Sequence, residues 1–489
     1  MILSKANIPA IHPQAKLRVP AGNIFELPEK VIQFGTGVLL RGLPDYFIDK
    51  ANSQGVFNGR IVVIKSTGGD ANAFDEQDGL FTHCVKGIAA GQLVEETIVN
   101  AAISRVLSAN DEWEAVLACA ENPALDIIIS NTTEVGITLV KEQINTGVPS
   151  SYPGKLLAFL YRRYQWCKGD AAGGLVIIPT ELISDNGKKL LAILLELAAF
   201  DNLDAAFVQW LQQANDFCSS LVDRIVPGKL PAAAQAALEA ALGYTDALTI
   251  MSECYSLWAI ETSNEQTKAK LSFSQTDKGV VLAPDITKFK ELKLRLLNGT
   301  HTYSCGLAIA AGFATVKEAL ANDTFCTYIR QLMLQEIAPA ITGNVITAAD
   351  AEAFALQVID RFKNPHIEHQ WKSITMQYTS KMVLRNVPLL QWYYEKQQGV
   401  PQHMALGFAA YLLLLRGDAG FTLNDDKAAV LQQKWQRNPA LAALAQDVLS
   451  DVTLWGANLA SLAGFADAVT QFMQQLQQQP ALEVMAQLQ

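Results

Sequence analysis

Short apolar runs recur along the first 181 residues, and each ends at glycine or at polar residues. The runs are KVIQFG (30–35), GRIVVIKST (59–67), LDIIISNTT (125–133) and GGLVIIPTE (173–181). Between the first two lies LLRGLPDYFIDKANSQG (39–55), which has helical spacing. Near-continuous apolar strands that alternate with helices indicate a parallel sheet covered on both faces. The pattern therefore predicts an α/β domain in the N-terminal part of the chain.

The pattern changes near residue 285, where alanine, leucine and glutamine become dominant. Helical spacing is found in HTYSCGLAIAAGF (301–313), AFALQVIDRF (353–362), MALGFAAYLLLL (404–415) and DAVTQFMQQLQQQ (467–479). Amphipathic periodicity of this kind is typical of packed helices. We therefore predict two domains, an α/β domain over 1–285 and a mostly α-helical domain over 286–489.

Composition narrows the class of protein. A chain of 489 residues is too long for one compact core, and its 50% hydrophobic and 18% charged residues are typical of a globular protein. The net charge of −10 argues against nucleic acid as a partner. There is no apolar run of about 20 residues to span a membrane, and the first 20 residues lack the apolar segment of a signal peptide. The seven cysteines are scattered, so neither disulfides nor a zinc knuckle are indicated. We expect a cytoplasmic protein.

A glycine turn follows the first predicted strand. Gly35-Thr36-Gly37 lies between that strand and a helix, where a dinucleotide-binding fold needs a tight turn and bare backbone near the pyrophosphate. The third glycine position of the fingerprint is Leu40, so a Rossmann-like cofactor site and a plain βα turn are both open. Where an acidic residue would hold the ribose, the second strand ends in Lys65-Ser66-Thr67, with Asp70 just beyond; Lys65 leaves NADP open.

KLRLLNGTHTY (293–303) places Lys293, Asn298 and His301 in an apolar setting. In an α-helix the three would fan across roughly 140°, with His301 between the other two. Each alone is explained by a snorkelling lysine, a helix end at Asn298 and a satisfied core histidine. As a group they favour a catalytic role over a structural one, because a desolvated lysine has a lowered pKa and serves as an acid–base group. An amide donor beside it stabilises an oxygen that gains negative charge, so hydride transfer at a hydroxyl or carbonyl needs no metal.

These residues carry a resemblance to a known family. KLRLLNGTH resembles the K-x-x-x-x-N-x-x-H signature of the mannitol dehydrogenase family, the polyol-specific long-chain dehydrogenases. The resemblance implies a Rossmann-like N-terminal domain and a helical catalytic domain. It also implies that Lys293 is the general acid/base, that Asn298 polarises the substrate oxygen and that His301 orients the substrate.

Other stretches extend the resemblance over nearly the whole chain. FGTGVLLRG (34–42) is similar to the family's glycine turn followed by an arginine, SSLVDRIVP (219–227) to its V-D-R-I segment, and RFKNPHI (361–367) to its R-F-x-N-P stretch. The cofactor contacts that we expect are Gln33, Phe34, Gly35, Thr36, Gly37, Val38, Leu39, Leu40, Arg41, Ser66, Thr67, Asn131, Thr132 and Glu134. The substrate contacts that we expect are Asn186, Asp223, His369, Lys381 and Arg385.

Two departures from the family pattern bear on the substrate. Where mannitol dehydrogenases have C-D-N-x-x-x-N-G, residues 180–187 read TELISDNG, so a second amide donor to the substrate oxygen falls on Leu182. Ser373 stands where the family has an arginine. Both changes argue against a neutral polyol. Lys381 and Arg385 are cations suited to a carboxylate, with His366 and His369 close by in sequence; a surface salt bridge is equally open for Arg385.

The resemblance thus implies an NAD-dependent oxidoreductase that reduces a keto-uronate to an aldonate in hexuronate catabolism, with tagaturonate and altronate as the favoured pair. Fructuronate reduction and oxidation of a mannitol-type polyol remain as alternatives, as does a non-catalytic dinucleotide-binding sensor of sugar acids. A sensor has no need of the proton donor at Lys293. We expect no metal and no membrane partner, and by resemblance a monomer or weak homo-oligomer.

Overall fold

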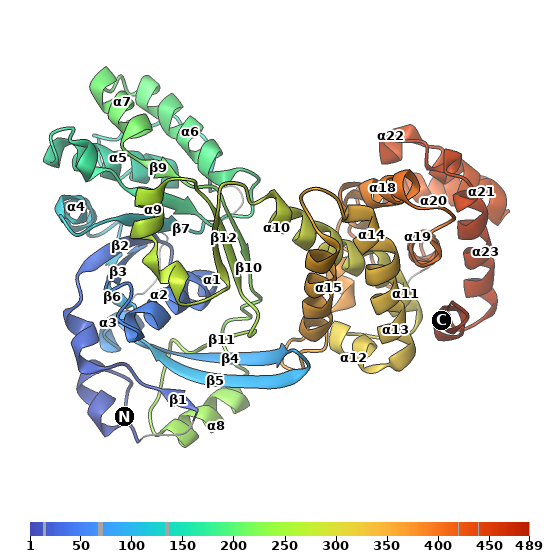
Figure 1. Cartoon of the computed structure of the whole chain (residues 1–489), viewed down its shortest axis with the longest axis horizontal. Helices are drawn as coiled ribbons and strands as arrows, with labels where there is room; N and C mark the ends of the chain where they lie inside the picture. The colour runs from blue at the N-terminus through green and yellow to red at the C-terminus, as the bar shows by residue number, and fades with distance from the viewer. Residues whose placement is uncertain (13–15, 67–71, 133–135, 419, 439, 489) are drawn as a thin grey trace. The chain divides into compact units, whose positions relative to one another are not determined.

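The computed structural model describes residues 1–12, 16–66, 72–132, 136–418, 420–438 and 440–488. The chain forms two compact units (Figure 1). The first comprises Met1–Lys86 and Leu93–Ile286, and the second comprises Gly87–Gln92 and Thr287–Gln489.

A six-stranded parallel sheet forms the centre of the first unit. Its strands are β2 (Glu29–Phe34), β3 (Arg60–Lys65), β6 (Ile103–Ser108), β7 (Ile127–Ser130), β8 (Val176–Pro179) and β9 (Asp216–Phe217). Their order across the sheet is β6-β3-β2-β7-β8-β9, and neighbouring strands pair in parallel. The first strand thus lies in the middle and the strand order reverses beside it, as in doubly wound dinucleotide-binding folds. The prediction of a Rossmann-like fold is confirmed.

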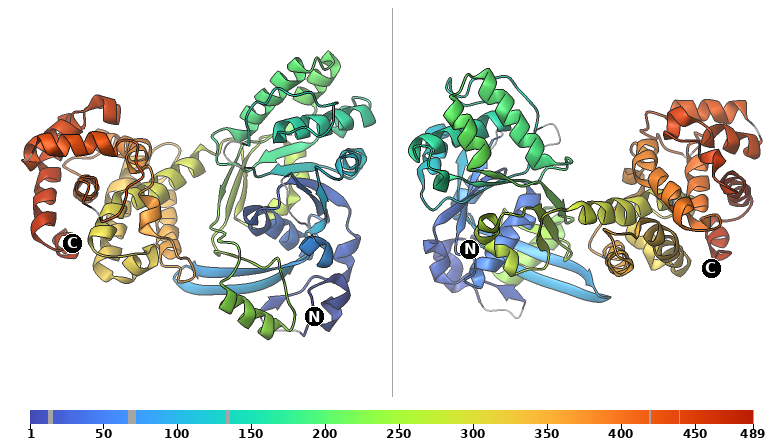
Figure 2. Two further views of the ribbon diagram at one scale, coloured as in Figure 1. Left: turned by 180° about the vertical axis from the view of Figure 1, so that it is seen from behind. Right: turned by 45° about the horizontal axis from the view of Figure 1, so that its top comes forward.

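Helices cover both faces of this sheet (Figures 1 and 2). The helices of the first unit are α1 (Val38–Gly42), α2 (Pro44–Ser53), α3 (Asn72–Glu76), α4 (Trp113–Ala118), α5 (Tyr152–Trp166), α6 (Asn186–Phe200), α7 (Ala205–Gln213), α8 (Ala232–Leu242) and α9 (Glu265–Lys270). Successive strand residues enter opposite cores. Val31 packs with α1 and α2, whereas Ile32 packs with α4 to α7. This explains why the strands read as continuous apolar runs.

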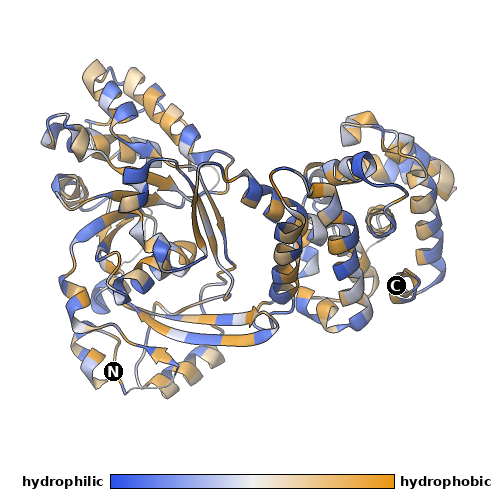
Figure 3. Ribbon diagram, in the orientation of Figure 1, coloured by the Kyte–Doolittle hydropathy of each residue, from blue (hydrophilic) through white to orange (hydrophobic). Residues whose placement is uncertain are grey.

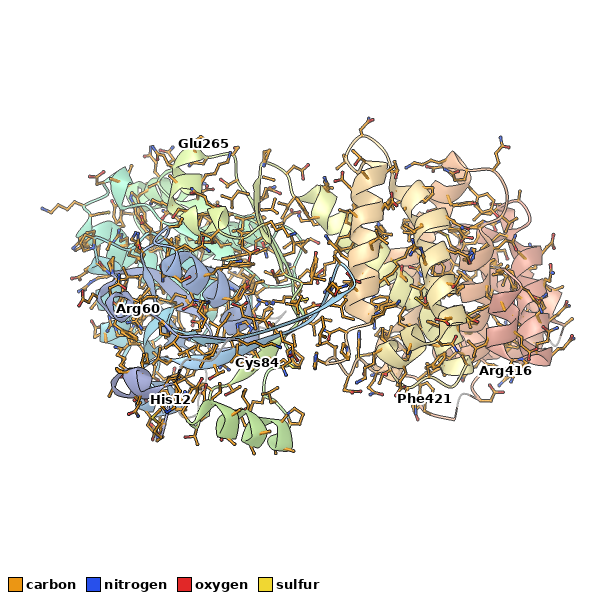
Figure 4. The ribbon with its side chains drawn as sticks, turned by 60° about the horizontal axis from the view of Figure 1, so that its bottom comes forward. His12, Arg60, Cys84, Glu265, Arg416 and Phe421 are labelled. Carbon is orange, nitrogen blue, oxygen red and sulfur yellow. The ribbon has the colours of Figure 1, made fainter. Side chains whose placement is uncertain are left out.

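Two smaller sheets complete the first unit. One has the order β1 (Leu17–Arg18), β5 (Gln92–Asn100), β4 (Phe81–Ala89), β11 (Ile250–Ser252); the other has the order β10 (Ser220–Asp223), β12 (Leu257–Glu261), β13 (Val280–Ala283). β4 and β5 carry both hydrophobic and hydrophilic residues along their length (Figure 3). Cys84, on β4, is buried (Figure 4), and all seven cysteines are free thiols.

The second unit is mostly helical, as predicted. Its helices are α10 (Thr287–Leu292), η6 (Lys293–Gly299), α11 (Thr300–Ala310), α12 (Val316–Ala321), α13 (Asp323–Gln331), η7 (Leu332–Ile337), α14 (Ala338–Ile341), α15 (Ala348–Phe362), α16 (Trp371–Ile374), α17 (Tyr378–Lys381), η8 (Met382–Asn386), α18 (Val387–Lys396), α19 (Gln402–Leu414), α20 (Ala428–Arg437), α21 (Leu441–Leu449), α22 (Val452–Trp455), α23 (Phe465–Gln478) and α24 (Ala481–Ala486). Three of these, η6, η7 and η8, are π-helices. Throughout the described part of the chain, helices fall short of the length and apolarity that crossing a membrane requires.

Two glycines fix the position of α11, the helix that continues η6. A Cβ atom at Gly306 would lie 2.9 Å from the backbone carbonyl oxygen of Ala410, on α19. A Cβ atom at Gly407 would lie 2.6 Å from the carbonyl oxygen of Tyr303. The backbones of α11 and α19 therefore approach as closely as glycine allows, which fixes where α11 packs.

Candidate active site

The glycine turn after β2 has two different glycines. Gly35 has a φ of +124°, and a Cβ there would lie 3.0 Å from both the Asn131 carbonyl oxygen and Leu40 Cδ1. Gly37 has no atom within 4 Å of where a Cβ would lie, and it precedes α1 with an extended backbone. Gly35 is thus required by the turn itself. Gly37 leaves open backbone where a dinucleotide phosphate could approach.

Four residues predicted to contact the cofactor instead point their side chains into the interior. Phe34 packs on Tyr152 with ring centroids 5.2 Å apart, and Leu40 lies in the core between α1 and the sheet. Arg41 donates from Nη1 to the Leu248 carbonyl oxygen at 2.5 Å. Gln33 is fully buried and donates from Nε2 to the Gly35 carbonyl oxygen at 3.3 Å. At these four positions only the backbone can contact a cofactor, because the side chains are buried in the strand and helix packing.

A buried carboxyl group lies beneath the glycine turn. Asp45, on α2, is fully buried, and this burial raises its pKa to about 8. The Gln33 side chain and the Arg41 guanidinium oppose the rise in pKa, and the charge of Asp49 adds to it. Among the described residues, neither Asp45 carboxyl oxygen has a hydrogen-bond partner of normal geometry. Asp45 is therefore a neutral acid at neutral pH, next to the side chain that supports the Gly35 carbonyl.

The ends of β7 and β8 are tied together by an acidic residue that sequence reasoning missed. Glu181 accepts from the Thr132 amide at 2.8 Å and from Thr132 Oγ1 at 3.0 Å. Its other oxygen accepts from Ser130 Oγ at 3.2 Å. Asn131 donates from Nδ2 to Thr180 Oγ1 at 3.0 Å. The available signal was an acidic residue directly after an apolar strand, at the sheet edge where such folds bind cofactors.

Thr67, Asp70 and Glu134 lie outside the described residues. Ser66 directly follows the end of β3 and is partly buried. Lys65, the last residue of β3, is only 9% exposed.

The predicted substrate residue Asn186 has no remaining hydrogen-bonding capacity. Its Nδ2 donates to the carbonyl oxygens of Pro179, Glu181 and Ser220, and its Oδ1 accepts from the amides of Gly187 and Ser220. Through these bonds Asn186 joins β8, α6 and β10, and its contact with a substrate stays a prediction. Leu182, where the family has a donor, is 63% exposed. Asp223 is buried at the end of β10.

The segment with Lys293 and Asn298 is a π-helix, which corrects the spacing assumed for an α-helix. A π-helix closes its turn between residues i and i+5, so residues five apart stand nearly above one another. Lys293 and Asn298 are five apart, and His301 follows three residues later in α11. The three side chains are therefore gathered on one side more closely than the predicted fan of about 140°. Lys293 and Asn298 are half-buried, and His301 is buried.

His301 stands in an aromatic pocket. Its ring stacks on Phe362 with centroids 4.1 Å apart, and the rings of His369 and Trp371 contact it edge-on at 5.0 Å and 5.9 Å. Burial, together with the charges of His369 and Arg385, holds the pKa of His301 well below its ordinary value. Among the described residues, its Nε2 atom has no hydrogen-bond partner. A neutral imidazole with a free ring nitrogen can bind a substrate hydroxyl.

Two cations lie near this pocket. Lys381 donates from Nζ to the Ile374 carbonyl oxygen at 2.9 Å, and Arg385 donates from Nη1 to Thr302 Oγ1 at 3.2 Å. Burial lowers the pKa of both, and the charge of Arg385 lowers the pKa of Lys381 further. Within the described part of the chain neither forms an ion pair with a carboxylate. Two half-buried cations that repel each other favour an anionic ligand.

Most of the chain matches known protein families and relatives. Residues 29–272 match the mannitol dehydrogenase Rossmann domain, and residues 285–477 match the mannitol dehydrogenase C-terminal domain. The chain is 37% identical over 466 residues to an altronate oxidoreductase of Bacillus subtilis (strain 168), covering 94% of this chain and 95% of that protein. It is 35% identical to an altronate oxidoreductase of Klebsiella pneumoniae (strain 342), covering 91% of this chain and 94% of that protein.

Solved structures share the fold. A Pseudomonas fluorescens mannitol 2-dehydrogenase, in a ternary complex with NAD and D-mannitol, superposes with a TM-score of 0.70 at 22% identity, covering 100% of this chain and 99% of that one. A substrate-free D-sorbitol dehydrogenase gives a TM-score of 0.79 at 22% identity, covering 99% of this chain and 100% of that one.

Proposed function

The chain belongs to the mannitol dehydrogenase family, and we propose that it is an NAD-dependent tagaturonate reductase, or altronate oxidoreductase. It is a dehydrogenase that acts on a CH–OH group and uses a nicotinamide dinucleotide. Support for the substrate comes from the relatives named above and from four stretches that resemble such enzymes. These are STGGDANAFDEQDGLFTHCVKG (66–87), NTTEVGI (131–137), PTELISDNG (179–187) and NPHIEHQWKSI (364–374).

The observation that carries the proposal is the grouping of acid–base and anion-binding side chains in the second unit. Lys293 and Asn298 stand on one side of η6, and the unpartnered ring nitrogen of His301 follows them. Lys381 and Arg385 are cations without a carboxylate partner among the described residues. A sugar acid carries both a hydroxyl to be oxidised and a carboxylate, so it matches both groups.

The residues have separate roles in the proposed reaction. When bound, the nicotinamide supplies the hydride for reduction of the keto group. Lys293 gives a proton to the alkoxide oxygen as it forms, and takes that proton back in the reverse direction. Asn298 donates an amide hydrogen bond to the same oxygen, which stabilises its developing charge. His301 positions a neighbouring hydroxyl, and Lys381 and Arg385 hold the carboxylate.

The first unit would hold the dinucleotide. The open backbone at Gly37 fits the pyrophosphate, and the cross-linked ends of β7 and β8 fit the nicotinamide side of the sheet edge. NAD is preferred over NADP because Lys65 is only 9% exposed and so does not display a cation for a 2′-phosphate. We assign dinucleotide binding to residues 1–285 and substrate binding to 286–489.

The test is NADH oxidation with tagaturonate, fructuronate and, in the reverse direction, altronate and mannitol. Lys293→Ala is expected to lower turnover with tagaturonate by at least about 10²-fold, because acid–base catalysis typically contributes that much. Lys363→Ala, at an exposed lysine of the same unit, is the matched control. Full activity in Lys293→Ala would refute the lysine mechanism. Bound NADH without turnover of any sugar acid would instead indicate a sensor.

A further inference from the structure

Two π-helices of the second unit, η6 and η8, pack against each other, and a proline explains the form of η8. Pro388 is the second residue of α18, directly after η8. Proline has no N–H and its ring clashes with the carbonyl four residues earlier, which here belongs to Leu384. Widening the turn relieves this clash. The Leu384 carbonyl oxygen then lacks the donor that an ordinary α-helix would provide at position 388.

Arg295, from η6, supplies a donor to that carbonyl. Its Nη1 donates to the carbonyl oxygens of Leu384 and Arg385, both at 2.8 Å. Its Nε donates to Glu291 Oε2 at 2.9 Å, and its guanidinium lies 4.8 Å from the Trp392 ring centroid. The residue is only 6% exposed. The guanidinium is therefore locked between two helices and an aromatic face, unlike a surface arginine.

A side chain of η8 also bonds back toward η6 and the helix α11 that continues it. Arg385, from η8, donates from Nη1 to Thr302 Oγ1 at 3.2 Å and approaches the Asn298 carbonyl oxygen at 3.5 Å. Between the two arginines, a Cβ at Gly299 would lie 3.2 Å from Asn386 Oδ1. The two helices are thus in direct contact and are bonded from both sides. Arg295 thus binds the backbone carbonyl of Arg385, and the side chain of Arg385 in turn approaches the Asn298 carbonyl oxygen.

We propose that Arg295 is a positioning residue that sets η6 against η8, and so sets the proton donor at Lys293 against the carboxylate-binding cation at Arg385. This inference rests on the proposed function. A sugar acid is held at two points, its carboxylate and its reacting carbon, so the separation of the two helices decides whether the carbon meets Lys293. A misplacement of about 1 Å can cost about 10²-fold in rate. Arginine is needed because its planar fork donates to several acceptors at once, whereas lysine is a point charge.

The test compares Arg295→Ala, Arg295→Lys and the exposed control Arg330→Ala in the full chain. Arg295→Ala is expected to lower kcat with tagaturonate by about 10²-fold, with the KM for NADH close to that of the wild type because the dinucleotide residues lie in the other unit. Methylguanidinium added to Arg295→Ala should restore turnover, whereas methylammonium should not. Arg295→Lys should remain impaired, and Arg330→Ala should behave as wild type.

Folded Arg295→Ala, verified by circular dichroism, that retains kcat within about threefold of the wild type would overturn the inference. A loss of kcat that methylguanidinium does not restore would also overturn it, since destabilisation alone explains such a loss. The wild-type rates separate the two proposals. If the wild type turns over only another substrate, the substrate assignment fails, and the same variants are compared on that substrate. If the wild type turns over no sugar acid or polyol, both proposals fail.

Discussion

Asp45→Asn is expected to stabilise the first unit, and the gain should grow as pH rises. Asp45 is fully buried under the glycine turn, and burial raises its pKa from 3.8 to about 8. The folded state therefore keeps the proton over a pH range in which the unfolded chain releases it. Asparagine is neutral in both states, so the substitution removes this difference while it preserves the shape of the side chain.

The magnitude follows from the difference in pKa. A raised folded-state pKa contributes stability that is fully present below the unfolded value of 3.8 and is lost as pH rises to about 8. At about 1.4 kcal/mol for each pKa unit, the loss is about 4 kcal/mol at pH 7 and about 6 kcal/mol at high pH. Asparagine avoids that loss. An imperfectly paired amide would offset about 1–3 kcal/mol of the gain.

The assay is calorimetric unfolding of wild type and Asp45→Asn between about pH 5 and pH 9, with the transition of the first unit followed separately. The difference in free energy of unfolding should widen with pH up to about pH 8 and then level off. Asp75→Asn, at an exposed aspartate of the same unit, should show no such widening. Parallel stability curves for wild type and Asp45→Asn would refute the claim that Asp45 is neutral in the folded protein.

Three substitutions at the dinucleotide site have separable outcomes. Gly35→Ala should destabilise the first unit by about 1–3 kcal/mol, because its φ of +124° strains an alanine; an unchanged melting temperature would contradict this. Gly37→Ala should leave stability within about 0.5 kcal/mol yet raise the KM for NADH, measured from initial rates, since the new methyl group meets only the incoming cofactor. Glu181→Gln should raise the same KM and cost about 1.5–3 kcal/mol by weakening the charged acceptor of the Thr132 amide; an unaltered KM would show that Glu181 does not position the cofactor.

The main sheet was predictable because its strands are buried on both faces. Ile32 and Val31 enter different cores, so apolar residues follow one another along the strand, and the run stands out in the sequence although the buried Gln33 interrupts it. The π-helical form of Lys293–Gly299 was not predictable, because residue periodicity presumes the α-helical turn and no proline follows η6. For η8 a signal existed in Pro388, whose missing N–H disrupts the ordinary helical hydrogen bonds.

Within the site, residue type identified side chains able to bind ligands or take part in catalysis. It did not show which of them already form hydrogen bonds within the protein. Arg41 and Asn186 resemble ligands in sequence, yet their partners are the carbonyl oxygens of Leu248 and Ser220, which only the fold brings near. Glu181 was missed because its hydrogen-bond partners, too, are brought near only by the fold. Its partner Thr132 follows the end of the neighbouring strand β7, and strand pairing is not visible from local sequence.

The central place of β2 in the sheet has a consequence for the order of assembly. β2 pairs on one side with β3 and on the other with β7, where Val31 lies opposite Ile127. During synthesis, the half-sheet β6-β3-β2 is complete in sequence once residue 108 has emerged, well before β7 exists. Parallel strands with long connections pair slowly, so this half waits with one edge of β2 open. The Gly35 turn, which packs against the Asn131 carbonyl, closes only when β7 arrives. The cofactor-binding edge of the sheet is therefore complete only after β7 has paired with β2.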